Sequence, residues 1–334
     1  MRRNWKIILG VLVSVLSLIV SIRSFDLQQI ADAVRMADFI WVIPAVLLYL
    51  GALGARTLRM MVLFLPEKRV PFIELLSSMA MGRGANNIYP FRVGEVVRWA
   101  LFHRLNKVSG PMSFASIVIE RVFDGITMLL FLVIVVFAGG LPPDMYEVAW
   151  AALALFGVAL SLIYAQVLWP TKMKQLMRWF AHNLVPSQYQ DRVENVLGEI
   201  IQSFATIGSV RSLTMVLLTS FLVWSFETAM YRVMMTAFGF GVSFHRLMLM
   251  AAVANLATSL PSAPGNIGTF DGAVILALRS VIGVNLSIAY ISLLHAVLWL
   301  TETLAGLFFM WRTGMNRRQL ADMVNGERIK GFAP

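Results

Sequence analysis

Long apolar segments dominate this sequence and restrict the chain to folds that hold helices in a lipid bilayer. A transmembrane helix needs about 20 mainly apolar residues, and six segments approach or exceed that length: residues 7–22, 39–55, 112–138, 148–169, 212–238 and 286–311. Hydrophobic residues make up 58% of the chain and charged residues 14%, whereas soluble domains average about 45–50% and about 25%. Because the apolar runs are continuous rather than alternating, we predict an all-α, polytopic membrane helix bundle and exclude a transmembrane barrel.

Two further apolar segments are interrupted by residues that break helices. Residues 81–98 contain three arginines, two adjacent asparagines, a proline and three glycines, and residues 259–272 are again rich in Pro, Gly and Asn. The flanking arms are shorter than a full span; they comprise residues 72–81 and 96–102 around the first break, and 248–260 and 272–284 around the second. We therefore predict about six full spans plus two re-entrant helical hairpins. The topology closes only if the hairpins have opposite sense, which suggests an inverted repeat.

The distribution of basic residues predicts how the spans are oriented. Lys and Arg number 28 against 18 Asp and Glu, and in membrane proteins such an excess collects in cytoplasmic loops rather than marking a nucleic-acid partner. Arg56 and Arg59 are interpreted as the start of one such loop, after the second span. We expect a single transmembrane domain over residues 1–334, multi-pass in the cell (cytoplasmic) membrane. Both termini, and an amphipathic connection over about residues 170–211, are expected to be cytoplasmic.

The first interrupted segment has side chains suited to binding an anion inside the membrane. Arginine presents a rigid fork of donors that matches phosphate oxygens, and ionisable groups at membrane depth are costly enough to indicate function. The alternative is that Glu95 pairs with an arginine only to hold the turn. The candidate substrate-binding residues here are Arg83, Asn86, Asn87, Pro90, Arg92, Glu95 and Arg98.

The second interrupted segment is expected to contribute backbone groups to the same site. Pro and Gly release backbone groups from helical pairing, and such groups can line a cavity. A half-helix that starts near Gly268 would present unpaired N–H groups to an anion. The candidates in this segment are Pro261, Pro264, Gly265, Asn266, Gly268 and Asp271.

Ionisable residues inside the long spans form a third candidate group. Glu120 and Asp124 are four residues apart and share a helix face, with Arg121 beside them, so the hairpin arginines are natural partners. A buried salt-bridge network with a purely structural role explains these residues equally well. The proposed coupling or charge network comprises Glu120, Arg121, Asp124, Glu227, His295 and Glu302.

Several kinds of chemistry find no support in the sequence. The chain has no cysteine, which excludes disulfides, thiolate nucleophiles and Cys-containing metal sites. None of the 4 histidines stands at metal-ligand spacing from another. We find no nucleophile–base pair, P-loop or dinucleotide-binding motif. We therefore assign no catalytic residue, metal or cofactor.

Three motifs resemble the signatures of a known family. They are NNIYPFRVGEVVRWALF at residues 86–102, SIVIERVFDG at 116–125, and LATSLPSAPGNIGTFDGAVILAL at 256–278. Together they resemble the flippase-like family that includes the transmembrane region of lysylphosphatidylglycerol synthase. Asp271 stands where that family usually has Glu, one methylene longer. The residues that match the motifs are Pro90, Arg92, Gly94, Glu95, Arg98, Glu120, Arg121, Asp124, Pro261, Pro264, Gly265 and Gly268.

The resemblance implies movement of lipids or lipid-linked saccharides across a bilayer. The soluble aminoacyl-transferase domain of the synthase has no counterpart in this sequence, so lipid aminoacylation is not expected. The leading hypothesis is a non-enzymatic transporter or flippase for a membrane lipid with an anionic head group, either a phospholipid or a polyprenyl-phosphate carrier. The alternatives are a membrane-embedded enzyme or accessory subunit of lipid or glycan modification, with Glu120 or Asp124 as acid or base, and a structural subunit. The sequence leaves open whether the chain forms a homo-oligomer.

Overall fold

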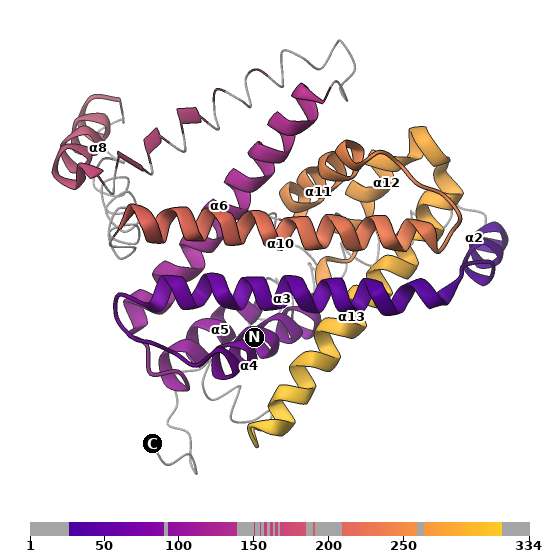
Figure 1. Cartoon of the computed structure of the whole chain (residues 1–334), viewed down its shortest axis with the longest axis horizontal. Helices are drawn as coiled ribbons and strands as arrows, with labels where there is room; N and C mark the ends of the chain where they lie inside the picture. The colour runs from indigo at the N-terminus through magenta and orange to yellow at the C-terminus, as the bar shows by residue number, and fades with distance from the viewer. Residues whose placement is uncertain are drawn as a thin grey trace, which may run out of the picture.

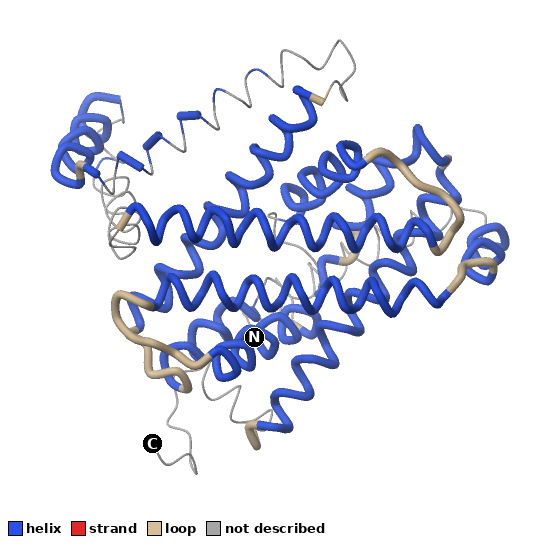
Figure 2. The backbone as a smooth tube through the Cα atoms, viewed as in Figure 1, coloured by secondary structure: helices blue, strands red, loops and turns tan. Residues whose placement is uncertain are grey.

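The computed structural model describes residues 27–89, 93–138, 168–184, 209–258 and 264–315, with Gln190 and a few single residues between 150 and 165. Every regular element in this part of the chain is helical (Figure 2). The expected first span at residues 7–22, most of the span at 148–169, and Pro90, Arg92 and Pro261 lie outside the described residues.

Two long antiparallel helices form the centre of the bundle. Helix α3 (Val42–Phe64) runs beside α10 (Val210–Thr236) across the whole molecule (Figure 1). The 3-10 turn η1 (Phe39–Trp41) precedes α3, and its N-cap residue Asp38 donates its N–H to the carbonyl oxygen of Ala237, just after α10. Buried positions on α3 recur at alternating spacings of three and four, which is the pattern of a helix packed along a partner. They are Ala45, Tyr49, Ala52, Arg56, Arg59 and Leu63.

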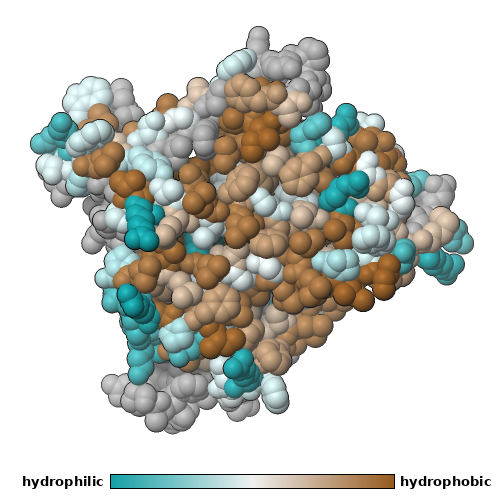
Figure 3. Space-filling view, in the orientation of Figure 1, coloured by the Kyte–Doolittle hydropathy of each residue, from teal (hydrophilic) through white to brown (hydrophobic). Residues whose placement is uncertain are grey.

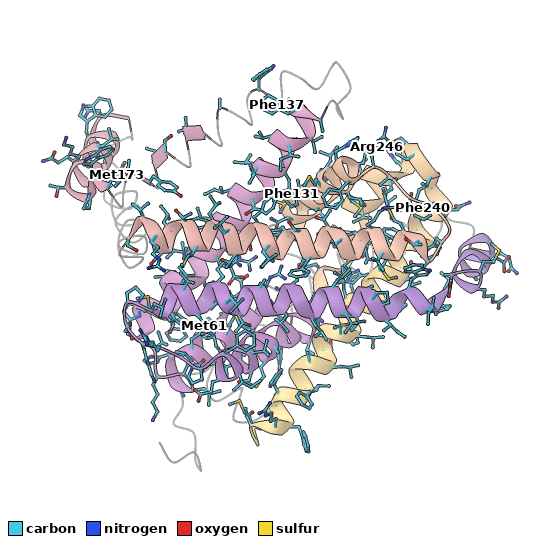
Figure 4. All side chains as sticks on the ribbon, viewed as in Figure 1. Met61, Phe131, Phe137, Met173, Phe240 and Arg246 are labelled. Atoms are coloured by element: carbon cyan, nitrogen blue, oxygen red, sulfur yellow. The ribbon has the colours of Figure 1, made fainter. Side chains whose placement is uncertain are left out.

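The other helices pack around this pair. Helix α4 (Phe72–Ile88) lies against α3, and α5 (Val93–Arg104) folds back on α4. Helix α6 (Gly110–Phe137) crosses α10 near Phe131, which is labelled in Figure 4. The Phe131 ring meets that of Phe221 edge to face, with ring centroids 5.8 Å apart. Helices α11 (Phe244–Thr258) and α12 (Thr269–Ile282) are joined through the turn η3 (Pro264–Asn266). Helix α13 (Val284–Arg312) crosses obliquely and packs on α4 and α12.

The first interrupted segment is more helical than the sequence predicts. Its arms are the whole of α4 and α5, 17 and 12 residues long, so residues 81–88 are helix rather than a turn. The glycines stay in the helix because they allow close contacts between helices. A Cβ atom on Gly84 would stand 3.2 Å from the Cα of Gly306 on α13, and one on Gly94 would overlap the carbonyl oxygen of Gly82. These residues join helices instead of ending them.

Four helices in the described part of the chain are long and apolar enough to cross a membrane: Phe39–Phe64, Val210–Thr236, Pro264–Ile282 and Val284–Arg312. Hydrophobic side chains cover the middle of the face in Figure 3, and hydrophilic ones gather mostly toward its left and right margins, where α3 and α10 begin and end. The prediction of an all-α membrane protein is confirmed at this level. Helix α8 (Pro170–Leu184) lies within the expected connection at residues 170–211, and α2 (Leu27–Arg35) precedes the bundle.

Apolar packing is concentrated in two large clusters on either side of a polar centre. One joins α4 and α5 to the second half of α3 and the first half of α6, around Phe64, Met79 and Phe102. The other joins α11, α12 and α13 to the first half of α3 and the second half of α10, around Met234 and Tyr290. Buried charged side chains of α3, α6 and α10 lie between the two clusters and position the site described next.

Candidate functional site

A polar cavity of about 140 Å³ lies where the two interrupted segments meet inside the bundle. Asn86 and Asn87 at the end of α4 line it together with Gly265 and Asn266 of η3. The ionisable residues on its wall come from six helices: Arg56, Arg83, Glu95, Arg121, Asp124, Glu227, His295 and Glu302. Apart from Arg56, all of these are residues that the sequence singles out, so folding gathers both motifs and the charged span residues into one space.

Arg59 is the centre of a fully buried ionic network beside the cavity. Its guanidinium contacts Asp124 at 2.7 Å and Glu120 at 3.2 Å, and it also donates to Ser220 at 2.8 Å. Glu120 is held from its other side by Arg98 of α5 at 2.8 Å. Since these side chains are at most 4% exposed, the pairs have to be complete for the charges to be tolerated. Helix α5 is thereby attached to α6.

Arg56 and Arg59 correct the interpretation of a cytoplasmic basic cluster. Both lie within α3 and are buried, with 3% and 0% of their surface exposed. Arg56 pairs with Glu227 of α10 at 2.6 Å and stacks over the ring of Trp224, 5.7 Å from its centroid. The prediction failed because α3 continues to Phe64, past the end of the apolar run. The sequence does contain a signal for this position, because Arg56 and Arg59 continue the spacing of three and four residues that marks the buried face of α3.

Arg83 and Arg121 differ from the buried arginines Arg56, Arg59 and Arg98 because their side chains are partly exposed, by 21% and 35%. Arg83 holds Glu302 of α13 at 2.6 Å, and Tyr49 donates to the same carboxylate oxygen. Arg121 contacts Glu120 at 3.0 Å but reaches Glu95 and Asp124 only at 3.6 and 3.9 Å. Arg121 thus has the loosest pairing among the arginines of the cavity wall. Sequence reasoning missed Tyr49, whose hydroxyl becomes relevant only once α3 and α13 are adjacent.

The expected excess of arginine is absent from the assembled cavity. Its described wall has three arginines (Arg56, Arg83, Arg121) and four carboxylates (Glu95, Asp124, Glu227, Glu302). An excess of arginine is expected only when the first interrupted segment is counted alone. In the folded chain, α6, α10 and α13 add the carboxylates that compensate it.

Asn87 fastens the first hairpin to the last helix. Its amide donates to the backbone oxygen of Trp299 at 3.1 Å and to the Thr303 hydroxyl at 3.2 Å. The same Trp299 ring packs on the second motif, because a Cβ on Gly265 would lie 3.0 Å from it. Gly265 has a φ of 67°, a left-handed conformation that glycine adopts without cost. The end of α4 and the turn η3 are therefore both held against one turn of α13.

The N-terminus of α12 differs from the expected anion site. The Gly268 N–H donates to the Asp271 carboxylate at 2.8 Å, so this group is not open to a ligand. An acidic residue at the third helical position caps the helix in this way. Asp271 is in turn paired with His295 of α13. The sequence predicts His295 and Glu302 on one helix face; both line the cavity, but each has a different partner.

The hydrogen bonds of His295 require a proton between it and Asp271. Its Nε2 lies 2.9 Å from the Gly265 carbonyl oxygen, which can only accept, so Nε2 carries hydrogen. Its Nδ1 is in hydrogen-bond contact with Asp271 Oδ1, and that contact needs a second proton on one of the two atoms. Loss of that proton would leave two lone pairs facing each other. The two side chains therefore share one proton, beside the cavity that His295 lines.

The comparisons with known proteins agree with the motifs. A family model described as the lysylphosphatidylglycerol synthase TM region matches residues 7–306, which confirms the resemblance seen in the sequence. The glycosyltransferase AglD of Haloferax volcanii is 24% identical over 80% of this chain and 48% of that protein. A UPF0104 membrane protein of Methanothermobacter thermautotrophicus is 24% identical over 84% of this chain and 86% of its own length. No solved structure matches.

One prediction has to be corrected in the light of these relatives. The sequence motifs predict a protein that is not an enzyme, whereas a relative aligned with 80% of the chain is named a glycosyltransferase. This chain spans about half the length of that relative, 48%. The absence of a recognisable nucleophile or cofactor motif was therefore too weak a basis for excluding enzymatic activity.

Proposed function

We propose a transport function for this chain, which belongs to the lysylphosphatidylglycerol synthase TM region family: it moves an anionic lipid across the membrane as a flippase. The head group would be that of a phospholipid or of a polyprenyl-phosphate carrier, which share a phosphate. The observation that carries the proposal is the cavity lined by residues of both motifs and by ionisable side chains within a membrane helix bundle. Buried ion pairs are often no more stabilising than apolar residues of similar size, and ionisable groups in membrane helices mark substrate or ion pathways.

The exposure of the arginines separates those that hold the structure from those that can bind substrate. Arg56, Arg59 and Arg98 are at most 4% exposed and are enclosed by their carboxylates. Arg83 and Arg121 face the cavity, and a phosphate can replace one of their carboxylate partners because two of its oxygens can accept hydrogen bonds from the guanidinium fork, as the two oxygens of a carboxylate do. Glu302 pairs with Arg83, and Glu120 and Glu95 pair with Arg121, and these carboxylates would keep the site closed until substrate binds. Substrate binding exchanges one set of ion pairs for another.

The finer topology belongs to the same proposal. Helices α4 and α5 would form one re-entrant hairpin, and α11 and α12 the other, with about six full spans around them in a single domain. The supporting facts are that α4, α5 and α11 have 17, 12 and 15 residues, fewer than the about 20 that a span needs, and that α4 touches η3. Helix α12 has 14 residues and reaches 19 only together with η3. Discontinuous helices that meet at the midplane form the substrate sites of many transporters.

Reconstitution tests this function directly. Vesicles containing the purified protein would be loaded with fluorescent phosphatidylglycerol, a fluorescent polyprenyl phosphate or fluorescent phosphatidylcholine, and dithionite quenching would measure transfer between leaflets. We expect faster transfer of one or both anionic lipids and no effect on the zwitterionic lipid. The two anionic arms distinguish the phospholipid from the carrier. Equal transfer in protein-free vesicles would refute the flippase.

A second candidate is a membrane-embedded enzyme or accessory subunit of lipid or glycan modification. Two observations favour it: the relative named a glycosyltransferase, and the His295–Asp271 pair, which can move a proton at the cavity wall. Mass spectrometry of the lipids in the same vesicles, after addition of sugar-nucleotide donors, separates the candidates. A lipid of increased mass that forms only with protein would favour the enzyme.

A further inference from the structure

A second hollow, of about 340 Å³, lies on the outer side of α13. Three of its residues follow one another at every fourth position of the helix: Ser292, Ala296 and Leu300. They extend about 12 Å along the axis at 1.5 Å per residue. The small side chains of Ser292 and Ala296 leave the hollow open, and Ile267 and Leu300 form apolar walls that are 43% and 50% exposed. We call this hollow the α13 groove; Asp271, His295 and Trp299 complete it.

The α13 groove and the polar cavity share a wall. His295 and Trp299 line both spaces, so two side chains separate the ionised interior from a surface open to the bilayer. Trp299 also contacts both motif turns, through Asn87 and Gly265. Tryptophan suits such a boundary because its ring is apolar and its N–H is polar.

The volumes of the two spaces suit different parts of one lipid molecule. The polar cavity, at about 140 Å³, is smaller than the roughly 300 Å³ of pockets that enclose a whole small molecule. It has room for a phosphate head group but not for a hydrocarbon chain, and its ionised wall would not tolerate one. The chain of a bound lipid therefore has to leave the cavity, and the groove lies directly behind the shared wall.

We propose that the α13 groove holds the hydrocarbon chain of the lipid whose anionic head group occupies the polar cavity, with Trp299 and His295 between the two parts. This inference rests on the proposed function and adds a lateral opening to it. The groove differs from the rest of the lipid-facing surface of α13 because its floor reaches polar groups of the cavity. A chain in it would bring the attached head group within reach of Arg83 and Arg121.

Photo-crosslinking tests the assignment without requiring transport. A phosphatidylglycerol that carries a diazirine in its acyl chain would be incubated with the reconstituted protein, and its adducts located by mass spectrometry. We expect adducts at Ile267 and Leu300 that disappear with excess unlabelled phosphatidylglycerol, because the site is saturable. Adducts at Leu304, one turn further along α13 and 61% exposed, should persist because ordinary bilayer lipid surrounds that position. Adducts at Leu300 that resist competition would overturn the proposal.

A substitution that fills the groove is the second experiment. Ala296→Trp should lower competable labelling at Ile267 about tenfold, the effect of losing contact with one or two buried methylene groups, while Leu304→Trp leaves it unchanged. The thermal shift produced by inorganic phosphate, which has no chain, should be the same in both variants and the original protein. Unchanged labelling in Ala296→Trp would refute the groove. If the groove is labelled as expected but no lipid crosses the bilayer, the proposed flippase fails and the groove remains a lipid-binding site.

Discussion

Single arginines in this protein have two different tasks, and their exposure separates them. Arg59 and Arg98 are enclosed by Asp124 and Glu120 and hold α3, α5 and α6 together. Arg83 and Arg121 reach the cavity, and in the proposed transport they would change partners. Substitutions in the two groups should therefore affect different measurements.

Asp124→Asn should destabilise the protein by about 3–5 kcal/mol, because it leaves buried Arg59 without its closest carboxylate. Trp224 also donates to the same oxygen at 3.0 Å, so the site has little freedom to rearrange. Thermal unfolding in detergent measures the loss, and the exposed pair Asp32–Arg35 supplies the control Asp32→Asn, expected to be near neutral. If Asp124 instead takes up a proton during transport, the variant would be stable but would lose the pH dependence of transport. A stable variant with an unchanged pH profile would exclude both roles.

Arg121→Lys should reduce transport about tenfold while leaving the melting temperature nearly unchanged. Lysine keeps the charge but lacks the planar fork for a bidentate contact with phosphate, and the 35% exposed side chain contributes little to packing. The matched control is Arg279→Lys on α12, which is exposed and outside the cavity. Normal transport by Arg121→Lys would remove this residue from the site. The sequence makes the same prediction for Arg92, which lies outside the described residues.

The helices of the two interrupted segments are joined to α13 by close contacts that tolerate little change in side-chain size or hydrogen bonding. The first hairpin meets α13 through Gly84 and Asn87, and the second through Gly265 and His295. The site therefore depends on α13 as the helix to which both motif turns are attached. Loosening either attachment should disturb one turn without unfolding the bundle.

His295→Phe should free the turn of the second motif. The ring can still pack against Phe270, which it meets edge to face with centroids 5.5 Å apart, but both hydrogen bonds are lost and Asp271 remains unpaired by α13. An unsatisfied buried polar group costs about 1–3 kcal/mol, so hydrogen exchange over residues 264–272 should become faster. His245→Phe, at a residue whose ring bonds to Ser243, should leave exchange there unchanged. Equal protection in both variants would contradict the attachment.

Gly84→Ala and Gly125→Ala form a matched pair for the contact between α4 and α13. A Cβ at Gly84 meets backbone atoms of Glu302 and Gly306 at 3.2 Å, so the helices have to separate and we expect a loss of about 1–3 kcal/mol. At Gly125 a Cβ meets nothing within 4 Å, and alanine should stabilise α6 by about 0.5–1 kcal/mol. Unfolding temperatures of the two variants test the contact. A shift in the same direction for both would show that the contact is not tight.

The whole molecule is arranged with apolar clusters at both ends of a polar centre, along the direction of α3 and α10. With 23 residues, α3 is about 35 Å long, close to the thickness of a bilayer core, about 30 Å. Its two ends should therefore lie on opposite membrane surfaces. The polar cavity then falls near the middle of the membrane, since Arg56 and Tyr49 are both near the middle of α3.

Cysteine labelling tests this orientation, and the chain has no cysteine of its own to interfere. Single cysteines at Gln175 in α8 and in the C-terminal tail should react with an impermeant maleimide only from the cytoplasmic side. Met36→Cys, at a residue 80% exposed beside the start of α3, should react only from the opposite side. Labelling of Gln175→Cys from outside would contradict the topology derived from the basic residues.

The amino-acid sequence by itself determined the fold class, the family and most of the charged residues of the site. Apolar length and helical spacing are local properties, so Glu120, Asp124 and the two interrupted segments can be recognised without coordinates. The tertiary structure decided which groups meet. It turned Arg56 and Arg59 from an expected loop into buried partners of Glu227 and Asp124, each more than 60 positions away. The tertiary structure also places Gly84 inside a helix, where it contacts Gly306. It pairs the Gly268 N–H with the Asp271 carboxylate in a hydrogen bond. These outcomes depend on which helices become neighbours, because a charge in a bilayer is stable only where another helix brings its partner, and spacing along the chain does not contain that information.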